Sequence, residues 1–250
     1  MFKAKTDKIF KLSQEHAEVV KELEGTFGKR TNIYIDFANV IRWQEKLNWH
    51  IDLKRLKQFF DSFDTINLVK FYSGTLVGNI ASEKFIEEIR SMRYDVHTKS
   101  VKIMKLSIDV SSIPANSPAL LENFIRKPLL KEFNLETIEY LNKKLKELND
   151  KGIKFIQDKK CNFDVEIGRD MLIDYERNDI DNFILWSGDS DFADPVSQLL
   201  KDGKKVVIFG TARRISPELS NTGAQIFEIK KIKEFICWPR ESQKDPLLGP

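Results

Sequence analysis

Aspartates follow two short apolar stretches of this 250-residue chain, each at the point where a strand should end. Residues 183–186 (Phe-Ile-Leu-Trp) lead into Ser-Gly-Asp-Ser-Asp-Phe, which carries Asp189 and Asp191. Residues 32–35 (Asn-Ile-Tyr-Ile) lead directly into Asp36. Ligands of open α/β sheets bind at the carboxyl ends of the strands. The sequence therefore predicts that these three carboxylates meet at one edge of a sheet.

A further candidate, Asp164, lies on a helix predicted over residues 163–175. The apolar face of that helix is formed by Ile167, Met171 and Tyr175. Asp164 falls on the same face, where a carboxylate is costly to bury unless it is paired or binds a metal. Asp170 lies well around the helix from Asp164. We interpret it as solvated or ion-paired, with Arg169 or a group on the rim as partner, and keep it as a weaker candidate.

Carboxylates from three separate elements suit Mg²⁺ or Mn²⁺, hard cations that take oxygen ligands. Without a cation the cluster repels itself, so at least one carboxylate should bind protons more readily. The chemistry that such a site supports is metal-assisted phosphodiester hydrolysis by an activated water. The predicted metal ligands, which are also predicted catalytic residues, are Asp36, Asp164, Asp189 and Asp191. Asn39 joins the catalytic set because it could orient Asp36 or a metal-bound water.

The same residues have structural interpretations. Asp36 and Asn39 both suit the N-cap of a helix, a common position for Asp and Asn. Asp191 could cap the helix that follows it. Asp194 is a better candidate for that cap, because Pro195 then occupies the first helical position. We expect Asp194 to supply the cap, which leaves Asp189 and Asp191 without a routine structural role.

Positive and aromatic side chains near these motifs could hold a nucleic acid. The predicted phosphate contacts are Arg42, Lys159, Lys160, Arg169, Arg213 and Arg214. Arg213 and Arg214 are the strongest of these, since their loop should leave the same sheet edge as the acids. Trp43 and Trp49 could stack on unpaired bases. Large aromatic residues are mostly buried, so we favour the core for both.

Strands alternating with helices predict an α/β fold, a mostly parallel central sheet flanked by helices on both faces. The predicted strands are 32–36, 66–72, 94–98, 182–186, 206–209 and 225–229. The predicted helices are 7–24, 53–60, 82–92, 163–175, 195–201, 216–219 and 231–236. Between them we expect a helical insertion at about 99–152, with strands at 99–108 and 153–157 near its ends and helices at 120–124 and 135–148. Residues 1–30 are expected to form an N-terminal helical extension, residues 31–237 the main domain, and residues 238–250 a flexible tail.

Composition excludes several classes. The 41 Lys and Arg against 38 Asp and Glu give a net charge of only +3, so bulk charge does not indicate a nucleic-acid binder. Two cysteines and three histidines build neither a disulfide framework nor a zinc site. We find no apolar run long enough for a membrane span and no apolar signal-peptide core at the N-terminus. We therefore expect a cytoplasmic protein.

Three stretches resemble, in order, the signatures of NYN domains in the PIN-like nuclease superfamily, and the chain looks like the LabA-like bacterial branch. They are Ile-Tyr-Ile-Asp-Phe-Ala-Asn at 33–39, Asn-Phe-Asp-Val-Glu-Ile at 162–167 and Ser-Gly-Asp-Ser-Asp-Phe at 187–192. The resemblance implies a Rossmann-like fold and a Mg²⁺- or Mn²⁺-dependent ribonuclease that uses Asp36, Asp164, Asp189 and Asp191. Asn39 and Asp170 fall on recurring family positions. The chain departs from the family at Cys161, where a Lys-Gly pair is usual, and in its long insertion.

Our leading hypothesis is thus a metal-dependent endoribonuclease acting on single-stranded RNA. The alternative is a non-catalytic RNA-binding or regulatory module that retains the fold. A phosphatase with an aspartyl nucleophile is disfavoured, because the second Asp that this chemistry needs is replaced by Ala38. DNA stays open as a substrate, since nothing identifies a reader of the 2′-hydroxyl. The insertion and N-terminal helix could serve a homodimer or a protein partner.

Overall fold

The computed structural model describes residues 1–177 and 179–238, which fall into two compact units. Unit 1 combines residues 1–100 with the chain from residue 161 onward, and unit 2 is Val101–Lys160. The insertion expected at about 99–152 thus corresponds to a longer unit, because residues 155–160 pair with residues 102–107 inside it. The flexible tail expected at 238–250 lies outside the described residues apart from Trp238.

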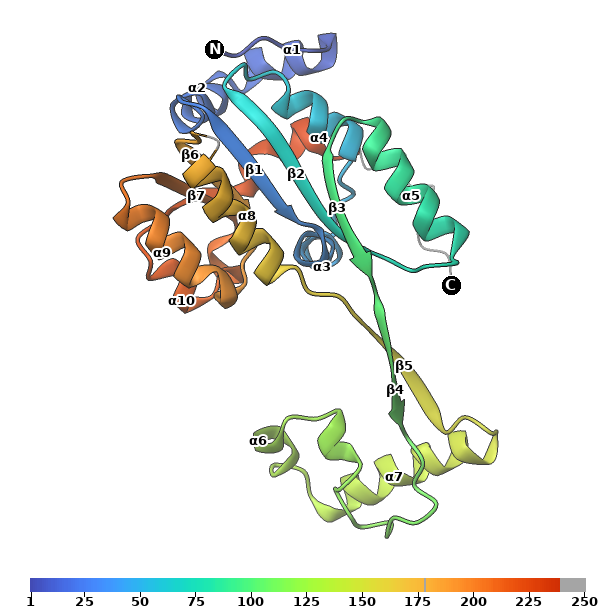
Figure 1. Cartoon of the computed structure of the whole chain (residues 1–250). Helices are drawn as coiled ribbons and strands as arrows, with labels where there is room; N and C mark the ends of the chain where they lie inside the picture. The colour runs from blue at the N-terminus through green and yellow to red at the C-terminus, as the bar shows by residue number, and fades with distance from the viewer. Residues whose placement is uncertain (178, 239–250) are drawn as a thin grey trace. The chain divides into compact units, whose positions relative to one another are not determined.

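Unit 1 is built on a six-stranded sheet with the order β3-β2-β1-β6-β7-β8 (Figure 1). Its strands are β1 (Thr31–Asp36), β2 (Ile66–Thr75), β3 (Asp95–Ser100), β6 (Asn182–Trp186), β7 (Lys205–Gly210) and β8 (Gln225–Glu228). Every neighbouring pair is parallel. The predicted α/β fold with a mostly parallel sheet is confirmed. The order places β1 beside β6, so the two strands that carry the aspartate motifs are direct neighbours.

Helices cover both faces of this sheet. One face packs against α8 (Asp164–Arg177), α9 (Ala193–Lys201) and α10 (Pro217–Ser220). The other packs against α1 (Asp7–Glu15), α2 (Ala17–Thr26), α3 (Phe37–Leu47), α4 (Leu53–Phe60), α5 (Ile80–Ser91) and α11 (Lys233–Ile236). Short 3₁₀ turns connect several elements: η2 (Ser190–Phe192), η3 (Ala212–Arg214) and η4 (Ile229–Ile232). Across the described residues, no helix has the length and apolar character needed to cross a bilayer.

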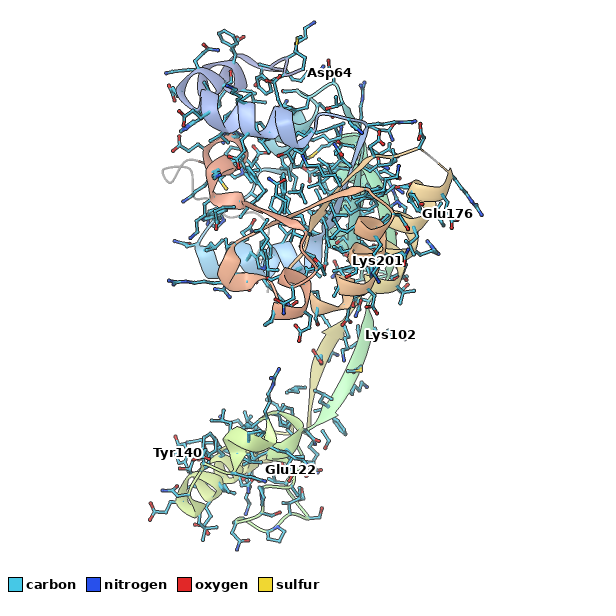
Figure 2. All side chains as sticks on the ribbon, turned by 90° about the vertical axis from the view of Figure 1, so that its left-hand side faces the viewer. Asp64, Lys102, Glu122, Tyr140, Glu176 and Lys201 are labelled. Atoms are coloured by element: carbon cyan, nitrogen blue, oxygen red, sulfur yellow. The ribbon has the colours of Figure 1, made fainter. Side chains whose placement is uncertain are left out.

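Unit 2 consists of a two-stranded antiparallel ribbon and a small helical core (Figure 2). The ribbon is formed by β4 (Lys102–Ser107) and β5 (Phe155–Lys160), and the helical elements are η1 (Leu121–Asn123), α6 (Lys127–Leu130) and α7 (Leu135–Asp150). The core is centred on Leu121, Leu130 and Ile138. The Asn149 amide donates to the carbonyl oxygens of Ile108 and Ile153, both at 3.0 Å. This unit is therefore partly β-structure, and the strands expected near both ends of the insertion pair with each other to form its ribbon.

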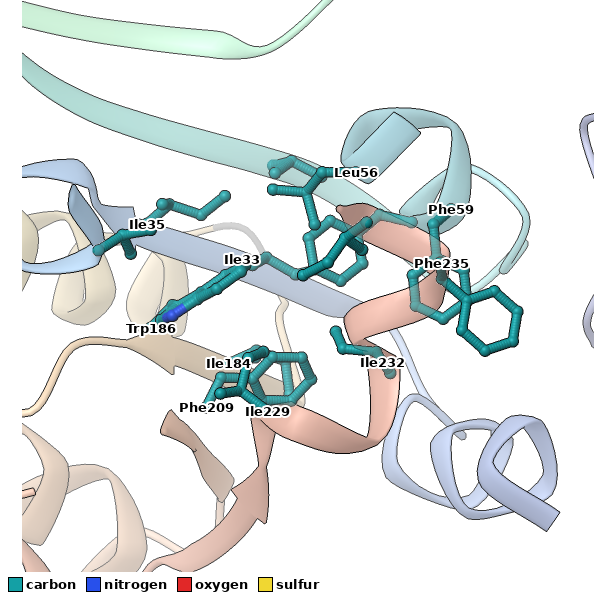
Figure 3. Packing of buried hydrophobic residues seen from close by; sticks show 14 of the residues in the cluster. Ile33, Ile35, Leu56, Phe59, Ile184, Trp186, Phe209, Ile229, Ile232 and Phe235 are labelled. Atoms are coloured by element: carbon teal, nitrogen blue, oxygen red, sulfur yellow. The ribbon is translucent and has the colours of Figure 1, made fainter. Parts of the chain in front are cut away.

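The main core forms because alternate residues of the buried strands serve opposite faces. Ile33, Ile35, Ile184 and Trp186 pack with the phenylalanines of α4 and α11 on one side (Figure 3). Tyr34 and the neighbouring residues of β6 face α8 and α9 on the other. β1 and β6 are buried along their whole length, which explains the continuous apolar run of residues 183–186 in β6.

A buried ion pair lies between the sheet and α8. Lys70 on β2 and Asp174 on α8 are 2.8 Å apart, and their side chains are only 9% and 2% exposed. Asp174 also accepts hydrogen bonds from Asn32 (2.8 Å) and from the Tyr34 hydroxyl. Burial, followed by the charge of Asp174, raises the pKa of Tyr34 well above its usual value. The network fixes the position of α8, whose first residue is Asp164.

Four local features differ from the predictions. The helix expected over 7–24 is two helices, because His16 leaves helical geometry (φ −123°, ψ 43°) between α1 and α2. Helix α3, which begins immediately after β1, was not predicted. The strand expected over 99–108 is divided at Val101, so its first residues belong to β3 of unit 1 and the rest to β4 of unit 2. The predicted helix at 120–124 is only the 3₁₀ turn η1.

Removing one partner of the buried pair should strongly destabilise unit 1. We expect Asp174→Ala to lower the free energy of unfolding by about 3–5 kcal/mol, because Lys70 is left charged and buried without its carboxylate. Urea denaturation followed by tryptophan fluorescence measures this. The matched control is Glu22→Gln, which removes an exposed ion pair with Lys231 and should cost less than about 1 kcal/mol. Equal losses in both variants would contradict the assigned role of the pair.

Candidate functional site

The site begins at the end of β1, where Asp36 is buried and holds two hydrogen bonds. Its Oδ1 accepts from the Asn39 backbone N–H at 3.3 Å, so Asp36 is the N-cap of α3. Its Oδ2 accepts from the Ser187 hydroxyl at 3.1 Å. Asp36 therefore has the capping role that the sequence left open. It also joins β1 to β6, since Ser187 follows the last residue of β6.

The residues after β6 form a tight polar turn. Ser187 is fully buried and its Oγ also accepts the backbone N–H of Asp189 at 3.3 Å. Asp189 in turn accepts from the backbone N–H of Asp191 at 3.3 Å and caps the turn η2. One hydroxyl thus connects the carboxylate of Asp36 to the backbone of Asp189. The sequence placed Ser187 in a motif but did not assign it this role.

Asn39 connects α3 to the same turn. Its side-chain oxygen accepts the backbone N–H of Gly188 at 3.4 Å. The backbone N–H of Asn39 donates to Asp36. Asn39 therefore contacts both the end of β1 and the turn that follows β6. The capping role considered for Asn39 itself belongs to Asp36.

Gly188 is required by a close approach of three segments. A Cβ at this position would overlap the carbonyl oxygen of Arg214 and lie 3.1 Å from Trp43 Cζ2. The Ser216 N–H donates to the Gly188 carbonyl at 2.9 Å. Trp43 is 6% exposed and fills the space beneath this turn, which explains its burial in the core. The loop carrying Arg213 and Arg214 is thereby held against the aspartate turn.

Asp164 is the first residue of α8. Its backbone N–H donates to the Asn162 side chain at 2.7 Å, and its Oδ2 is buried without a hydrogen-bond partner among the described residues. Ile167 and Met171 on the same helix face are fully buried, as predicted from their spacing. An acid at a helix N-terminus is favoured by the helix dipole. An orphaned carboxylate oxygen is a group that a cation would satisfy.

The charges of the acids act on one another. Burial, the charges of Asp189 and Asp36, and hydrogen bonding with Asp191 raise the pKa of Asp164 to about 6. Burial and, to a smaller extent, the charge of Asp189 also raise the pKa of Asp36, against hydrogen bonds from Asn39 and Ser187 and the charge of Arg42. The four predicted carboxylates are thus near one another. The raised pKa values of Asp36 and Asp164 mean that a positive ligand would stabilise these two carboxylates in their ionised form.

The carboxylates do not form a ready-made coordination sphere. Within the described part of the chain, no three Asp, Glu, His or Cys side chains have the arrangement needed to hold a metal ion. Asp36 and Asp189 each use an oxygen to cap a backbone turn, which directs that oxygen toward the protein. Mutual repulsion opposes closer convergence of the charged groups. The donor set still suits Mg²⁺ or Mn²⁺, because it is carboxylate oxygen and includes the orphaned Oδ2 of Asp164.

The expectation that Asp194 caps the next helix was wrong. Turn η2 runs directly into α9, so the helical stretch begins at Ser190 and its cap is Asp189. Asp194 lies inside the first turn of α9 and is exposed. Asp189 therefore does have a structural role. Asp191 is exposed, its backbone N–H donates to Asp189, and its carboxyl group interacts with Asp164.

Asp170 is buried and not solvated, and Arg169, one of the partners considered for it, forms its ion pair. The guanidinium of Arg169 contacts Asp170 Oδ1 at 2.9 and 3.1 Å. Asp170 Oδ2 accepts from the Tyr72 hydroxyl at 2.9 Å and lies 3.4 Å from His97 Nδ1. Burial, followed by the charge of Asp170, raises the pKa of Tyr72. Asp170 thus connects α8 to β2 and β3, while Arg169 is engaged with it.

The remaining predicted phosphate contacts divide between the units. Arg213 is exposed and Arg214 half-buried on η3, beside Gly188. Arg42 on α3 is exposed, and its charge acts on Asp36. Lys159 and Lys160 are exposed on β5 of unit 2.

Comparisons with known proteins agree with the α/β fold. A family model for the NYN domain matches residues 120–230, which include Asp164, Asp189 and Asp191. The chain is 25% identical over 208 residues to the low amplitude and bright protein LabA of Synechococcus elongatus, covering 83% of this chain and 87% of LabA. A crystal structure of a protein of unknown function from Vibrio parahaemolyticus has the same fold. It superposes with a TM-score of 0.50 at 17% identity, covering 84% of this chain and 96% of that one.

The raised pKa of Asp164 gives a pH-dependent stability prediction. Its folded-state pKa of about 6 lies above the ordinary 3.8, so the ionised carboxylate destabilises the fold fully above pH 6 and not below about pH 4. We expect Asp164→Asn to raise stability by about 1 kcal/mol at pH 8 and to give no gain at pH 4. Thermal unfolding across this pH range in EDTA measures it. Asp194→Asn, an exposed acid in the first turn of α9, is the control and should show no such gain.

Gly188→Ala should disrupt the turn that carries the acids. The added methyl cannot fit against the Arg214 carbonyl without moving the backbone, so we expect a loss of about 1–3 kcal/mol. Gly25→Ala is the matched control, because nothing lies within 4 Å of a Cβ there and the residue is in α2. That variant should be stabilised by about 0.5–1 kcal/mol. Similar behaviour of the two variants in denaturation would refute the close approach.

Proposed function

Because this chain carries an NYN domain, a nuclease-like module of the PIN-like fold, we propose that it is a metal-dependent ribonuclease that hydrolyses single-stranded RNA. The proposal rests chiefly on the buried Oδ2 of Asp164, which lacks a hydrogen-bond partner within the described structure beside two other carboxylates whose charges act on it. The helix dipole favours an acid at this position, but it does not supply the hydrogen bond that the buried Oδ2 lacks. The carboxyl group is suited to a cation shared with its neighbours.

We assign Asp36, Asp164 and Asp189 as the residues that would hold Mg²⁺ or Mn²⁺, and Asp191 as a more exposed contributor. A bound ion would supply a nucleophilic water and stabilise negative charge on the leaving oxygen. Ser187 and Asn39 would keep the acids in place, since they tie Asp36 and Gly188 together. Arg42, Arg213 and Arg214 are the unit 1 cations proposed to contact the phosphates of the substrate.

A second candidate is a non-catalytic RNA-binding or regulatory module. It is favoured by the lack of three converging ligands within the described residues and by the capping roles of Asp36 and Asp189. In that case the aspartates would serve only to shape the turns. Repulsion among the carboxylates in the absence of a cation also explains why they do not converge. We therefore rank the catalytic function first.

An assay of RNA cleavage in the presence of Mn²⁺ distinguishes the ribonuclease from the non-catalytic module. We expect the wild-type chain to cut a labelled single-stranded RNA, and Asp189→Asn to lower the rate on the order of 10²–10³-fold. EDTA should abolish cleavage by the wild type. Asp194→Asn removes an exposed carboxylate from the neighbouring helix turn and should keep the wild-type rate.

The ribonuclease and the non-catalytic module predict different effects of Asp189→Asn on RNA cleavage and RNA binding. Equal cleavage rates in the wild type and Asp189→Asn would eliminate the proposed acid site. RNA binding by both proteins with cleavage by neither, in Mn²⁺ and in Mg²⁺, would establish the regulatory module instead. Isothermal titration with Mn²⁺ alone adds an independent readout, with weaker binding expected for Asp164→Asn than for Asp194→Asn.

A further inference from the structure

The positive charge of this chain is concentrated in unit 2. Residues 101–160 contain 12 Lys and Arg against 8 Asp and Glu, a net charge of +4. The whole chain has +3, so the remaining residues have a net charge of −1. The unit that contains the acidic site thus has almost no net charge. Any strong electrostatic attraction for a polyanion comes from unit 2.

Within unit 2, the β4–β5 ribbon carries exposed lysines on both faces. The register pairs Ile103 with Lys159, Lys105 with Gln157 and Ser107 with Phe155. Directly opposed residues share a face of an antiparallel pair, and successive residues alternate between faces. One face is therefore formed by Ile103, Lys105, Ser107, Phe155, Gln157 and Lys159. This face, here called the Phe155 face, contains no acidic residue.

Two lysines lie directly opposite each other across the ribbon, and their repulsion lowers its stability. On the opposite face Lys102, labelled in Figure 2, stands directly across from Lys160. Like charges at opposed positions are destabilising, and a lone two-stranded ribbon is only marginally stable in water. Lys105 and Lys159 form no ion pair with any residue that the structure describes. Their charges are therefore available to an external anion.

The apolar residues of the Phe155 face are also unusually exposed. Phe155 is 56% exposed and Ile103 51%. An aromatic ring among unpaired lysines matches the composition of surfaces that hold single-stranded nucleic acids, where rings stack on bases and cations contact phosphates. A second copy of this ribbon is a poorer occupant, because it would bring lysines of the same charge together.

We propose that the Phe155 face of the ribbon binds single-stranded RNA, with Lys105 and Lys159 contacting phosphates and Phe155 stacking on a base. The proposal rests on the proposed function in taking RNA as the ligand. Lys159 on β5 and Lys105 on the neighbouring strand β4 would thus contact the same RNA strand.

Binding to a labelled oligouridylate in EDTA tests the proposal on the full-length chain, because no cleavage then interferes. We expect Lys105→Gln/Lys159→Gln to weaken binding by about 10-fold at 0.1 M salt and to reduce the slope of log affinity against log salt by about 1.4. Phe155→Ala should weaken binding by roughly 5–20-fold with little change in slope. All three side chains are exposed, so unfolding temperatures should match the wild type.

The matched control is Lys143→Gln/Lys146→Gln, which removes two exposed lysines from α7 in the same unit. It should keep the wild-type salt slope. The proposal is overturned if the two double variants bind alike, if Phe155→Ala binds as the wild type does, or if the wild type does not bind RNA. It is also overturned if the ribbon variants change only the oligomeric state in analytical ultracentrifugation, which would make the face a protein interface.

Failure of this proposal and failure of the nuclease assignment give different results. Mn²⁺-dependent cleavage that is unchanged by the ribbon variants at every salt concentration keeps the nuclease and removes the ribbon site. Loss of RNA affinity in the ribbon variants, with no cleavage by the wild type, supports the ribbon site and removes the nuclease.

Discussion

The Ser187 hydroxyl joins the ends of β1 and β6 and thereby brings the acidic groups together. It donates to Asp36 and accepts from the backbone of Asp189, so a single buried oxygen sets the relation of two carboxylates on neighbouring strands. Asn39 and Gly188 reinforce the same junction through a second hydrogen bond. These contacts require β1 and β6 to be adjacent and parallel, which the sheet order provides. The buried contacts of Asp174 with Lys70, Asn32 and Tyr34 hold α8, whose first residue is Asp164, against the same sheet.

Gathering carboxylates in this way costs stability, and the buried network beneath α8 offsets part of the cost. Asp164 resists ionisation because burial and its neighbours disfavour charge. By contrast, Asp174 lies on the same helix but has Lys70, Asn32 and Tyr34 as partners. The helix therefore carries one carboxylate that anchors it and another that lacks compensation. Such a difference in environment separates a structural acid from one available to a ligand.

The sequence predicted those parts of the fold that depend on local pattern. Strand β6 was predicted with its observed bounds, because a fully buried apolar run followed by Ser-Gly is unambiguous. The capping of η2 by Asp189 was missed, because Asp194-Pro195 suggested a later helix start and the 3₁₀ turn has no comparable signal. The roles of Ser187 and Trp43 depend on which strands are neighbours and which loops cross them. The Lys70–Asp174 pair likewise joins residues distant in sequence, and only the register of the sheet brings them together.

The division of charge between the units has a consequence for any polyanionic substrate. A site formed by the four aspartates would repel phosphate, and a bound divalent cation would reverse this only within the short range over which it is unscreened. Unit 1 has a net charge of −1 and contributes little attraction at longer range. A substrate that must approach acidic residues therefore benefits from a separate basic surface on the same chain, because the two binding events become intramolecular. Unit 2 begins one residue after β3 and ends four residues before Asp164, so along the sequence the basic ribbon directly precedes that acid.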